Sequence, residues 1–591
     1  MDIVNKIKES VKSSLEQLYS VDVDKPGITV NETKPEFEGD YTVVLFSFVK
    51  SLKKSPEQLG KELGESLVKN NSSLFTSFNV IKGFLNLTIA DSYWANFLQQ
   101  NYINPNFGNK PANGKKVMVE YSSPNTNKPL HLGHLRNNFL GWSVAEILKA
   151  EGYEIIKSCI VNDRGIHICK SMIAWQLFGN GATPQSTGIK GDHFVGDYYV
   201  QFNDEYKKQV DELIAAGMNK DEAEKQAPIM KQAQQMLVDW EAGKPDVIEL
   251  WKKMNSWVYE GFDITYKRIG SDFDVTYYES DTYLLGKSAV EDGLKKAVFI
   301  KKDDGSVWID LTDDGLDEKL LLRRDGTSVY ITQDIGLAQQ KYDQYKIDQS
   351  IYVVGDEQNY HFKVLKAICK KLGLPYANDI HHLSYGMVEL PTGKMKSREG
   401  TVVDADDIVD EMIAEAEKKT KEQGKTEGFT TEELNYLYDV IGLGGLKFFL
   451  LRVDPKKRMV FNPEESIDLH GFTATFIQYA YARIKSILRK EQPGSPQSAA
   501  GSLFKLEKAL IIKLEQLAAI LSQAATEHNP SVIGIYVFEL AKLFNSFYAE
   551  HSVMNAETEE KKQLRLQLSQ MTSNAIASCM HLLGIRVPER M

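Results

Sequence analysis

One short unit near residue 117 limits the folds open to this chain more than any other feature. The run VMVEYS (117–122) is typical of a buried strand, and a loop and a helix from about Gly133 to Glu151 follow it. A second strand-like run, EIIKSCIV (154–161), comes soon after Gly152. Strand, helix and strand in this order form the βαβ unit of a parallel sheet, so we expect an α/β domain here.

The rest of the chain divides around this unit. The stretch NPNFGNKPANGKK, rich in Pro, Asn and Gly, predicts a linker after a domain of mixed helices and strands. Strands are expected at 350–355 and near 381–390, and LLRRDGTSVYIT predicts a hairpin that turns at Asp325-Gly326. From about 432 onward the periodicity is almost purely helical. The expected parts are an N-terminal domain (1–103), the α/β domain (115–390) with an insertion at about 181–300, a loop and connecting helices (391–465), and a helical domain (466–591).

Length, charge and cysteine use exclude several classes of protein. The chain has 591 residues, too many for one core, and no apolar run approaches the ~18 residues that span a bilayer. Its first helix is amphipathic, which excludes a signal peptide. A net charge of −11 argues against a surface that binds nucleic acid everywhere, although local basic patches remain open. No C-x-x-C pair occurs, so neither a disulfide scaffold nor a zinc site is expected, and a reducing cytoplasm fits the four scattered cysteines, Cys159, Cys169, Cys369 and Cys579.

The segment SSPNTNKPLHLGHLRN carries the strongest functional signal. His131 and His134 lie in the first turn of the expected helix, and Gly133 between them lets a base or phosphate approach the backbone. A helix N-terminus presents N–H groups to phosphates, and imidazoles there can donate to a phosphate as charge develops. Taken alone, the pair also fits capping or core histidines. It fits a metal site less well, since no carboxylate or cysteine has the complementary spacing.

A basic segment, TGKMKSREGTVV, lies near the expected end of the α/β domain. Lys394, Lys396 and Arg398 occupy a Gly-bounded loop from which cations can reach the β- and γ-phosphates of a nucleotide. By itself, a basic loop of this kind is more often solvated surface.

The two segments together resemble the HIGH and KMSKS signatures of class I aminoacyl-tRNA synthetases. The longer string VEYSSPNTNKPLHLGHLRNN resembles the form found in arginyl-tRNA synthetases, and the resemblance covers essentially the whole chain. Ser397 stands in place of the second KMSKS lysine. Similar departures are common in this family, where a lysine just before HIGH is thought to substitute, and Lys128 is in that place.

The resemblance implies a fold and a reaction. The fold is a Rossmann-like α/β catalytic domain with HIGH- and KMSKS-type signatures, a helical C-terminal anticodon-binding bundle, and an α+β N-terminal domain that contacts the tRNA elbow. The reaction activates L-arginine with ATP and transfers it to the 3′ end of tRNA-Arg, with Mg²⁺ accompanying ATP and no zinc. The implied catalytic residues are Lys128, His131, His134, Lys394, Lys396 and Arg398. The implied ATP contacts are His131, Gly133, His134, Met387, Val388, Lys394 and Met395.

An arginine pocket needs a carboxylate that pairs with the guanidinium through two hydrogen bonds, with neutral acceptors around it. Tyr330 and Asp334 lie four residues apart in SVYITQDIG, which lets both face one cavity at a strand–helix junction. Each residue alone also fits helix capping or an exposed polar position. A polar pocket rejects lysine by ~10⁴ or more, so no editing domain is required. The arginine contacts that the resemblance implies are Glu120, Ser123, Asn125, His134, Tyr330, Asp334 and Gln358.

The C-terminal helices open with HGFTATFIQYAYARIKSILRK, in which aromatic and basic residues alternate. Unstacked anticodon bases favour this mixture, since stacking on aromatic rings contributes ~1–3 kcal/mol per base. An aromatic stripe at helical spacing is usually core, so some of these rings are expected to be buried. The ending LLGIRVPERM resembles the family's terminus, which approaches the anticodon loop. The implied tRNA contacts are Gln478, Tyr479, Arg483 and Met591.

Three rival functions share parts of this pattern. The cysteine enzyme of the same class would bind its substrate thiolate through zinc, for which the cysteines here supply no site. A small-molecule adenylyltransferase would rarely need so long a helical region. A non-catalytic tRNA-binding paralogue would tolerate loss of His131, His134 or Asp334, and all three are present. We expect a cytoplasmic monomer whose partners are tRNA-Arg, L-arginine and ATP, with no membrane partner.

Overall fold

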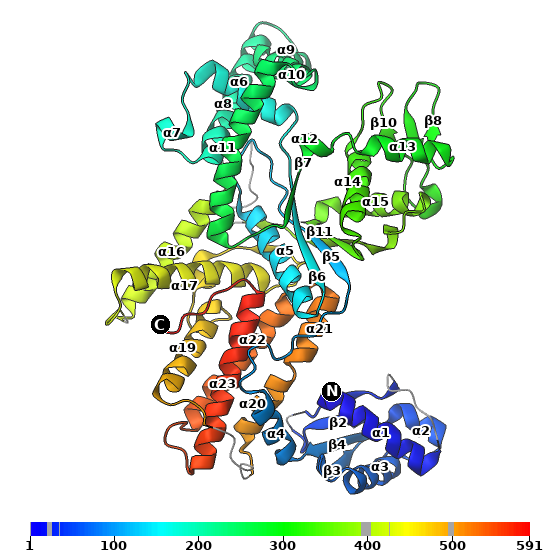
Figure 1. Ribbon diagram of the computed structural model, residues 1–591, viewed down its shortest axis with the longest axis vertical. Helices are drawn as coiled ribbons and strands as arrows, with labels where there is room; N and C mark the ends of the chain where they lie inside the picture. Colours follow the sequence, from blue (N-terminus) through cyan, green and yellow to red (C-terminus); the bar gives the residue numbers. More distant parts are fainter. Residues whose placement is uncertain are drawn as a thin grey trace.

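The computed structural model describes residues 2–20, 27–34, 36–389, 391, 403–424, 426–494 and 502–591. The described chain is elongated, with a sheet near its middle (Figure 1). A helical insertion extends from one side of this sheet, and the C-terminal bundle and the N-terminal domain lie beyond its other side.

The central sheet has five parallel strands in the order β12-β11-β5-β6-β7. Helix α5 (Leu132–Ala150) connects β5 to β6, which confirms the predicted βαβ unit. The strands predicted at 350–355 and near 381–390 are also present. The strand bounds are β5 Lys116–Glu120, β6 Glu154–Val161, β7 Val275–Tyr278, β11 Gln349–Gly355 and β12 Ile380–Tyr385.

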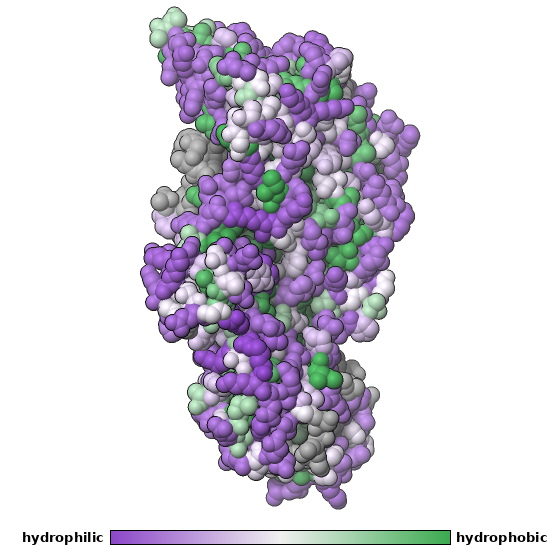
Figure 2. Space-filling view, turned by 60° about the vertical axis from the view of Figure 1, so that its left-hand side comes forward, coloured by the Kyte–Doolittle hydropathy of each residue, from purple (hydrophilic) through white to green (hydrophobic). Residues whose placement is uncertain are grey.

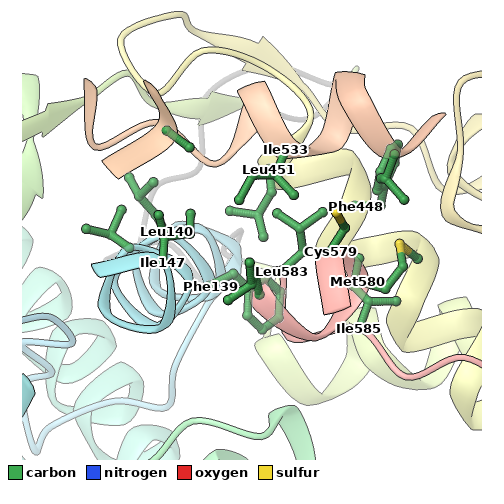
Figure 3. Close-up of a cluster of buried hydrophobic side chains, with 14 of the residues drawn as sticks. Phe139, Leu140, Ile147, Phe448, Leu451, Ile533, Cys579, Met580, Leu583 and Ile585 are labelled. Carbon is green, nitrogen blue, oxygen red and sulfur yellow. The ribbon is translucent and has the colours of Figure 1, made fainter. Parts of the chain in front are cut away.

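Helix α5 is buried on nearly all sides, which explains its apolar composition. It packs on the sheet through β5, β6 and β11, and on the C-terminal bundle through α17, α21 and α23. The hydroxyl of Ser143 donates to the carbonyl of Leu582 at 2.6 Å. Both domains therefore fix the helix that carries the two signature histidines. The apolar cluster between them contains Phe139, Leu140, Ile147, Phe448, Leu451, Ile533, Cys579, Met580, Leu583 and Ile585 (Figure 3).

The helical insertion differs at both ends from the predicted 181–300. It begins with α6, and the chain returns to the sheet as β7, which pairs with β6. In β7 only Tyr277 is buried, so neither an alternating nor a continuous apolar run signals this four-residue strand. The insertion contains α6 Ile166–Phe178, α7 Pro184–Thr187, α8 Gly191–Ala215, α9 Lys220–Gln226, α10 Pro228–Glu241 and α11 Pro245–Ile269.

A second excursion, between β7 and β11, includes a small antiparallel sheet in the order β10-β9-β8. The turn predicted at Asp325-Gly326 is present, with the Gly326 N–H donating to the carbonyl of Arg323 at 2.8 Å. The prediction of a second strand after this turn is wrong. Only Ser328 pairs with the first strand, through an isolated bridge to Leu322, and helix α14 begins at Tyr330. The elements are α12 Glu279–Thr282, α13 Gly286–Lys295, β8 Ile300–Lys301, β9 Val307–Ile309, β10 Lys319–Leu322 and α14 Tyr330–Tyr345.

The C-terminal part is helical, as the sequence predicts, apart from a short parallel pair of β13 (Val388–Glu389) and β14 (Met459–Val460). Helix α19 carries three of the candidate tRNA contacts, and Met591 follows the last helix. The helices are α16 Ala405–Glu422, α17 Thr431–Leu451, α18 Pro463–Ser466, α19 Ala474–Lys490, α20 Lys505–Glu515, α21 Leu517–Glu527, α22 Ser531–Glu550 and α23 Glu559–Leu582, whereas α15 Asn359–Lys371 lies earlier, between β11 and β12 of the central sheet.

The N-terminal domain combines helices with an antiparallel sheet in the order β1-β2-β4-β3, which confirms its predicted α+β class. It docks on the bundle: the Ile3 N–H donates to Glu515 at 2.7 Å, and Lys508 lies 2.8 Å from Asp40. Its elements are α1 Ile3–Tyr19, β1 Val30–Glu32, β2 Tyr41–Val44, α2 Phe46–Leu52, α3 Pro56–Asn70, β3 Phe75–Ile81, β4 Phe84–Ile89 and α4 Asp91–Asn101.

By length and composition, three helical stretches are long and apolar enough to cross a membrane. This differs from the expectation that no apolar run approaches that length. The three stretches are Thr431–Leu451, Lys505–Glu527 and Ser531–Glu550. In α17, 78% of the apolar window is buried inside the protein, where it packs against α5, α16 and α19. Burial between domains therefore accounts for the composition of α17. The molecular face in Figure 2 is mainly hydrophilic, with apolar residues in small separate groups.

We expect the variant His528→Asn to resist acid better than the parent chain. His528 caps α21 in a left-handed conformation (φ 48), which asparagine also adopts, and its ring lies 4.5 Å from that of His381. Burial, followed by His381, lowers the pKa of His528 to about 4. Since the pKa in the unfolded chain is about 6.5, this site loses stability as the pH falls from about 6.5 towards 4. Thermal unfolding at pH 7.5 and pH 5 should show the variant losing about 2 kcal/mol less than the parent, and equal losses would contradict the assignment.

Candidate active site

The candidate site lies at the carboxyl edge of the parallel sheet. Parallel strands end at the same edge, and in open α/β sheets ligands bind there. Residues 121–131 connect β5 to α5 along this edge, so α5 begins beside the ends of β5, β6 and β11.

The loop after β5 is held in an unusual conformation by α5 and the insertion. Ser122 has a φ of 60, in the left-handed region that costs a non-glycine residue free energy. Its N–H donates to Asn137 Oδ1 at 2.6 Å, and its Oγ lies 2.7 Å from the hydroxyl of Tyr266. With Ser122 fixed, Ser123 and Asn125 are exposed at the sheet edge.

The two signature histidines cap α5 together. Nδ1 of His131 accepts the N–H of Gly133 at 3.1 Å, and Nδ1 of His134 accepts the N–H of His131 at 3.2 Å. Their ring centroids lie 4.0 Å apart. A Cβ at Gly133 would come within 2.9 Å of the His131 ring, so a side chain there would displace the imidazole.

Both imidazoles are neutral donors. Burial, followed by the charge of Lys128, lowers the pKa of His131 to about 4. Burial, followed by His131, lowers the pKa of His134 well below its usual range. Because each Nδ1 accepts a hydrogen bond, each neutral ring carries its proton on Nε2. The N-terminus of α5 therefore combines two imidazole N–H donors with its own backbone donors, an arrangement suited to a phosphate.

Arg136, two residues after His134, is a buried organising residue that the sequence reasoning missed. Its guanidinium donates to the carbonyls of Gly386 at 2.6 Å, Lys457 at 2.9 Å and Pro455 at 3.2 Å. This anchor fixes the chain that carries the predicted ATP contacts Met387 and Val388. The available signal was an arginine close to the signature, in a helix that the sequence places between two strands of the sheet.

The predicted arginine contacts Tyr330 and Asp334 lie one turn apart on α14. Tyr330 is 75% exposed, and a carboxylate oxygen of Asp334 lies 2.5 Å from Nε2 of His361. Gln358 is exposed in a short 3₁₀ helix directly before α15, the helix that carries His361. The structure thus brings Asp334 against the segment that begins with Gln358. Sequence reasoning missed His361, although it lies only three residues after Gln358.

Glu120, predicted among the arginine contacts, lies buried at the end of β5. Its Oε2 forms an ion pair with Lys341 of α14, whose side chain is 1% exposed. The Lys341 ammonium also lies 4.6 Å from the ring of Tyr352. Lys341 therefore balances the charge of Glu120 through one carboxylate oxygen, and the second oxygen can still accept a hydrogen bond.

The predicted phosphate loop, with Lys394, Met395, Lys396, Ser397 and Arg398, lies outside the described residues. The described chain resumes at Val403, and the backbone of Asp404 forms an antiparallel bridge with that of His131. Next to this bridge is a cavity of about 230 Å³, with Lys128 and Tyr199 also in its wall.

One candidate tRNA contact is placed differently from the prediction. Gln478 is completely buried, and its side-chain amide donates to the carbonyls of Val440 at 3.1 Å and Arg586 at 2.9 Å. It therefore holds the C-terminal tail against α17 and cannot reach a base directly.

The other tRNA candidates come together in a large cavity. Tyr479, Arg483 and Met591 line a space of about 740 Å³, with Tyr548 and Arg590 also in its wall. The guanidinium of Arg483 lies 5.0 Å from the ring of Tyr479 and 5.6 Å from that of Tyr548. Exposed rings beside a guanidinium are suited to stacking with unpaired bases.

Three protein-family models match this chain along its length. The model described as the catalytic domain of class I (R) tRNA synthetases matches residues 97–462, more than half of the chain. The arginyl tRNA synthetase N-terminal domain matches residues 5–89, and the DALR anticodon binding domain matches residues 477–591.

Full-length relatives and solved structures agree with these matches. The chain is 51% identical to an arginine–tRNA ligase of Amoebophilus asiaticus and 52% identical to one of Bacteroides fragilis, with 100% of both chains covered in each case. Its fold matches the arginyl-tRNA synthetase of Thermus thermophilus (TM-score 0.78, 23% identity, all of both chains covered). It also matches that of Plasmodium falciparum (TM-score 0.77, 17% identity, 100% and 99% covered). This chain therefore belongs to the class I arginyl-tRNA synthetases and is an arginine–tRNA ligase.

Proposed function

We propose that arginine and ATP react where α5 begins, at the carboxyl edge of the parallel sheet. The observation that carries this assignment is the pair of neutral imidazoles of His131 and His134, each with its proton on Nε2. The carboxylate of arginine attacks the α-phosphate of ATP, and pyrophosphate leaves. The imidazole N–H groups stabilise the charge that develops on the α-phosphate, so positioning and electrostatics suffice without a covalent enzyme intermediate.

Cations offset the charge of the departing pyrophosphate. Magnesium arrives with the triphosphate as part of the substrate. Lys128 lies beside His131, in the wall of the same cavity, and can approach the phosphates from there. The basic loop supplies the remaining charge through Lys394, Lys396 and Arg398. The adenosine half of ATP contacts Gly133, Met387, Val388 and Met395.

Arginine is held by its guanidinium at α14. Asp334 accepts two hydrogen bonds from the guanidinium, while Tyr330 and Gln358 supply neutral contacts. The α-amino and carboxylate groups lie at the exposed end of the loop, beside Ser123 and Asn125. Glu120, at the end of β5, adds its second carboxylate oxygen to this set, since Lys341 binds only Oε2.

The helical end of the chain binds the tRNA. The cavity lined by Tyr479, Arg483 and Met591 takes anticodon bases, and the N-terminal domain contacts the tRNA elbow. The terminal ribose hydroxyl then attacks the adenylate at the sheet edge. We assign this reaction to the cytoplasm and to a monomeric enzyme.

The test is ATP–pyrophosphate exchange with each of the twenty amino acids, with and without total tRNA. Exchange with arginine alone is the expected result, and its dependence on tRNA would show whether adenylate formation needs bound tRNA. Exchange with another amino acid would overturn the pocket assignment.

We expect His361→Ala to raise the KM for arginine about tenfold, because a hydrogen bond to a charged group is worth about 1.5–3 kcal/mol. His361 orients Asp334 through the contact at 2.5 Å, and glutamine can place an N–H group near the position of Nε2. His361→Gln should therefore recover most of the loss. The KM for ATP, measured in the same exchange assay, should stay within about twofold. A KM for arginine that is unchanged in the alanine variant would remove His361 from the pocket.

A further inference from the structure

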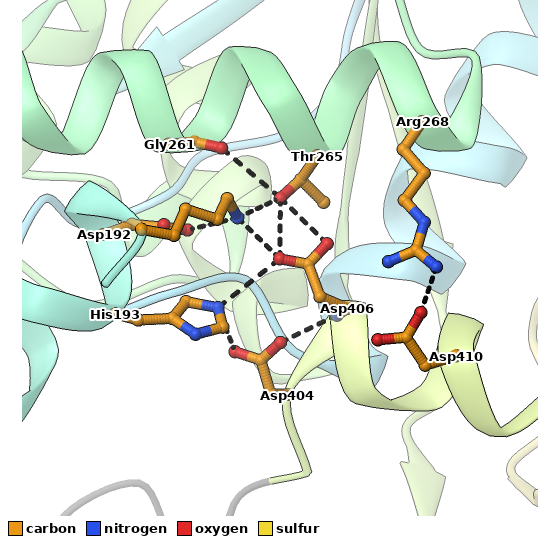
Figure 4. Close-up of polar contacts among 9 residues, drawn as sticks. Asp192, His193, Gly261, Thr265, Arg268, Asp404, Asp406 and Asp410 are labelled. Carbon is orange, nitrogen blue, oxygen red and sulfur yellow. Dashed lines mark hydrogen bonds and ion pairs between the residues drawn. The ribbon is translucent and has the colours of Figure 1, made fainter. Parts of the chain in front are cut away.

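A network of charged side chains joins the helical insertion to the residues at the start of α16 (Figure 4). The ammonium of Lys190, directly before α8, lies 2.6 Å from Asp406 Oδ2 and 3.1 Å from Asp192 Oδ2. It also donates to the hydroxyl of Thr265 on α11 at 2.5 Å. One lysine thus joins α8 and α11 of the insertion to the first turn of α16.

His193 adds a second cation to this network. Its Nε2 lies 3.2 Å from a carboxylate oxygen of Asp404 and 3.4 Å from one of Asp406. The carboxylates of Asp404 and then Asp406 raise the pKa of His193 to about 10, so its imidazole is charged at neutral pH. His193, Asp404 and Asp406 have the spacing of a metal site. Lys190 already lies against Asp406 and Asp192, so side chains of the protein itself supply cations to this network.

The network fixes the point where α16 meets the signature. Asp404 caps α16 by accepting the N–H of Asp406 at 2.7 Å. The backbone of Asp404 bridges that of His131, and the N–H of Ala405 donates to the carbonyl of Leu130 at 2.9 Å. The start of α16 therefore lies directly against the residues that begin α5.

The position of this backbone matters for both imidazoles. The N–H of His131 donates to Nδ1 of His134, and the ring of His131 accepts from Gly133. A shift of the His131 backbone would therefore turn both rings and move both Nε2–H donors. A displacement of about 1 Å at a reacting group can cost on the order of 10²-fold in rate.

We propose that Lys190 and His193 are positioning residues for the two signature histidines, so that the helical insertion is part of the machinery for adenylate formation. They hold Asp404 and Asp406, these fix the start of α16, and α16 fixes the backbone of Leu130 and His131. This inference rests on the proposed role of His131 and His134.

The test compares Lys190→Met with a matched variant that breaks another contact between α11 and α16. Arg268 of α11 binds Asp410 of α16 one turn further from the signature, so Arg268→Met breaks a tether that does not touch residues 404–406. We expect Lys190→Met to lower kcat in arginine-dependent pyrophosphate exchange by about 10- to 100-fold. The KM for arginine and the Kd for tRNA should stay within about twofold. Arg268→Met should keep a kcat close to that of the parent chain.

A second variant separates positioning from folding. Lys190→Met leaves Asp406 and the buried Asp192 without their cation and can reduce stability. Combining it with Asp192→Asn and Asp406→Asn removes all three charges at nearly constant volume. The triple variant should melt close to the parent temperature and remain as slow as Lys190→Met. A triple variant with the parent kcat, or an equal loss of kcat in Arg268→Met, would overturn the inference. Absence of arginine-dependent exchange in the parent chain would instead overturn the proposed function.

Discussion

The variant Asp334→Asn should raise the KM for arginine by about 100- to 1,000-fold, because truncating one side of a hydrogen-bonded charge pair costs about 2–5 kcal/mol. Asparagine keeps the size of the side chain and can still accept from His361 through Oδ1. It cannot, however, offer two charged oxygens to a guanidinium. In the proposed arrangement ATP contacts α5 and the chain after β12, away from α14, so its affinity should not change.

A calorimetric titration of each substrate checks this prediction. Asp343→Asn is a matched control on the same helix: Asp343 is exposed and binds Gln339 at 2.9 Å and Lys346 at 3.2 Å, away from the pocket. It should leave arginine affinity within about twofold of the parent value. If Asp334→Asn instead weakened arginine and ATP equally, the arginine pocket would lie elsewhere.

The parts of the fold that could be predicted are those with strong local patterns. β5, α5 and β6 form a continuous unit in which strand, helix and strand each carry their own apolar pattern. The short β7 has no such pattern, and its place in the sheet depends on pairing with β6 more than one hundred residues earlier. The second arm of the predicted hairpin fails for a related reason. Ile331, Ile335 and Ala338 lie at helical spacing and face a core that the helix fills.

The residue types of the site could be predicted more readily than their partners. The position of Asp334 four residues after Tyr330 was visible in the sequence, but its contact with His361 depends on how α14 and α15 pack. The same limit explains the misplaced contact of Gln478 and the unforeseen partner of Glu120. The burial of Gln478 depends on a tail that lies 108 residues further along the chain. The pairing of Glu120 with Lys341 spans 221 residues. Long-range packing therefore decides which polar residues remain available to a ligand.

The variant His134→Asn should lower kcat for arginine-dependent pyrophosphate exchange by about 100- to 1,000-fold, the usual cost of removing one preorganised donor to a developing negative charge. The oxygen of asparagine lies near the position of histidine Nδ1, so it can still accept the N–H of His131 and preserve the start of α5. What it lacks is the Nε2–H donor. The variant should therefore be folded, bind both substrates and fail in the chemical step.

The variant His134→Gln is the matched partner. Its amide nitrogen lies near the position of Nε2 and can still donate to the phosphate. It has no acceptor at the position of Nδ1, so it loses the hydrogen bond from the N–H of His131. It should be less stable than His134→Asn in thermal unfolding and yet faster in the exchange assay. This opposite order of stability and rate distinguishes a donor to the α-phosphate from a residue that only caps the helix. If His134→Asn kept its rate within about fivefold of the parent chain, the second histidine would be a cap alone, and the phosphate would depend on His131 and the backbone of α5.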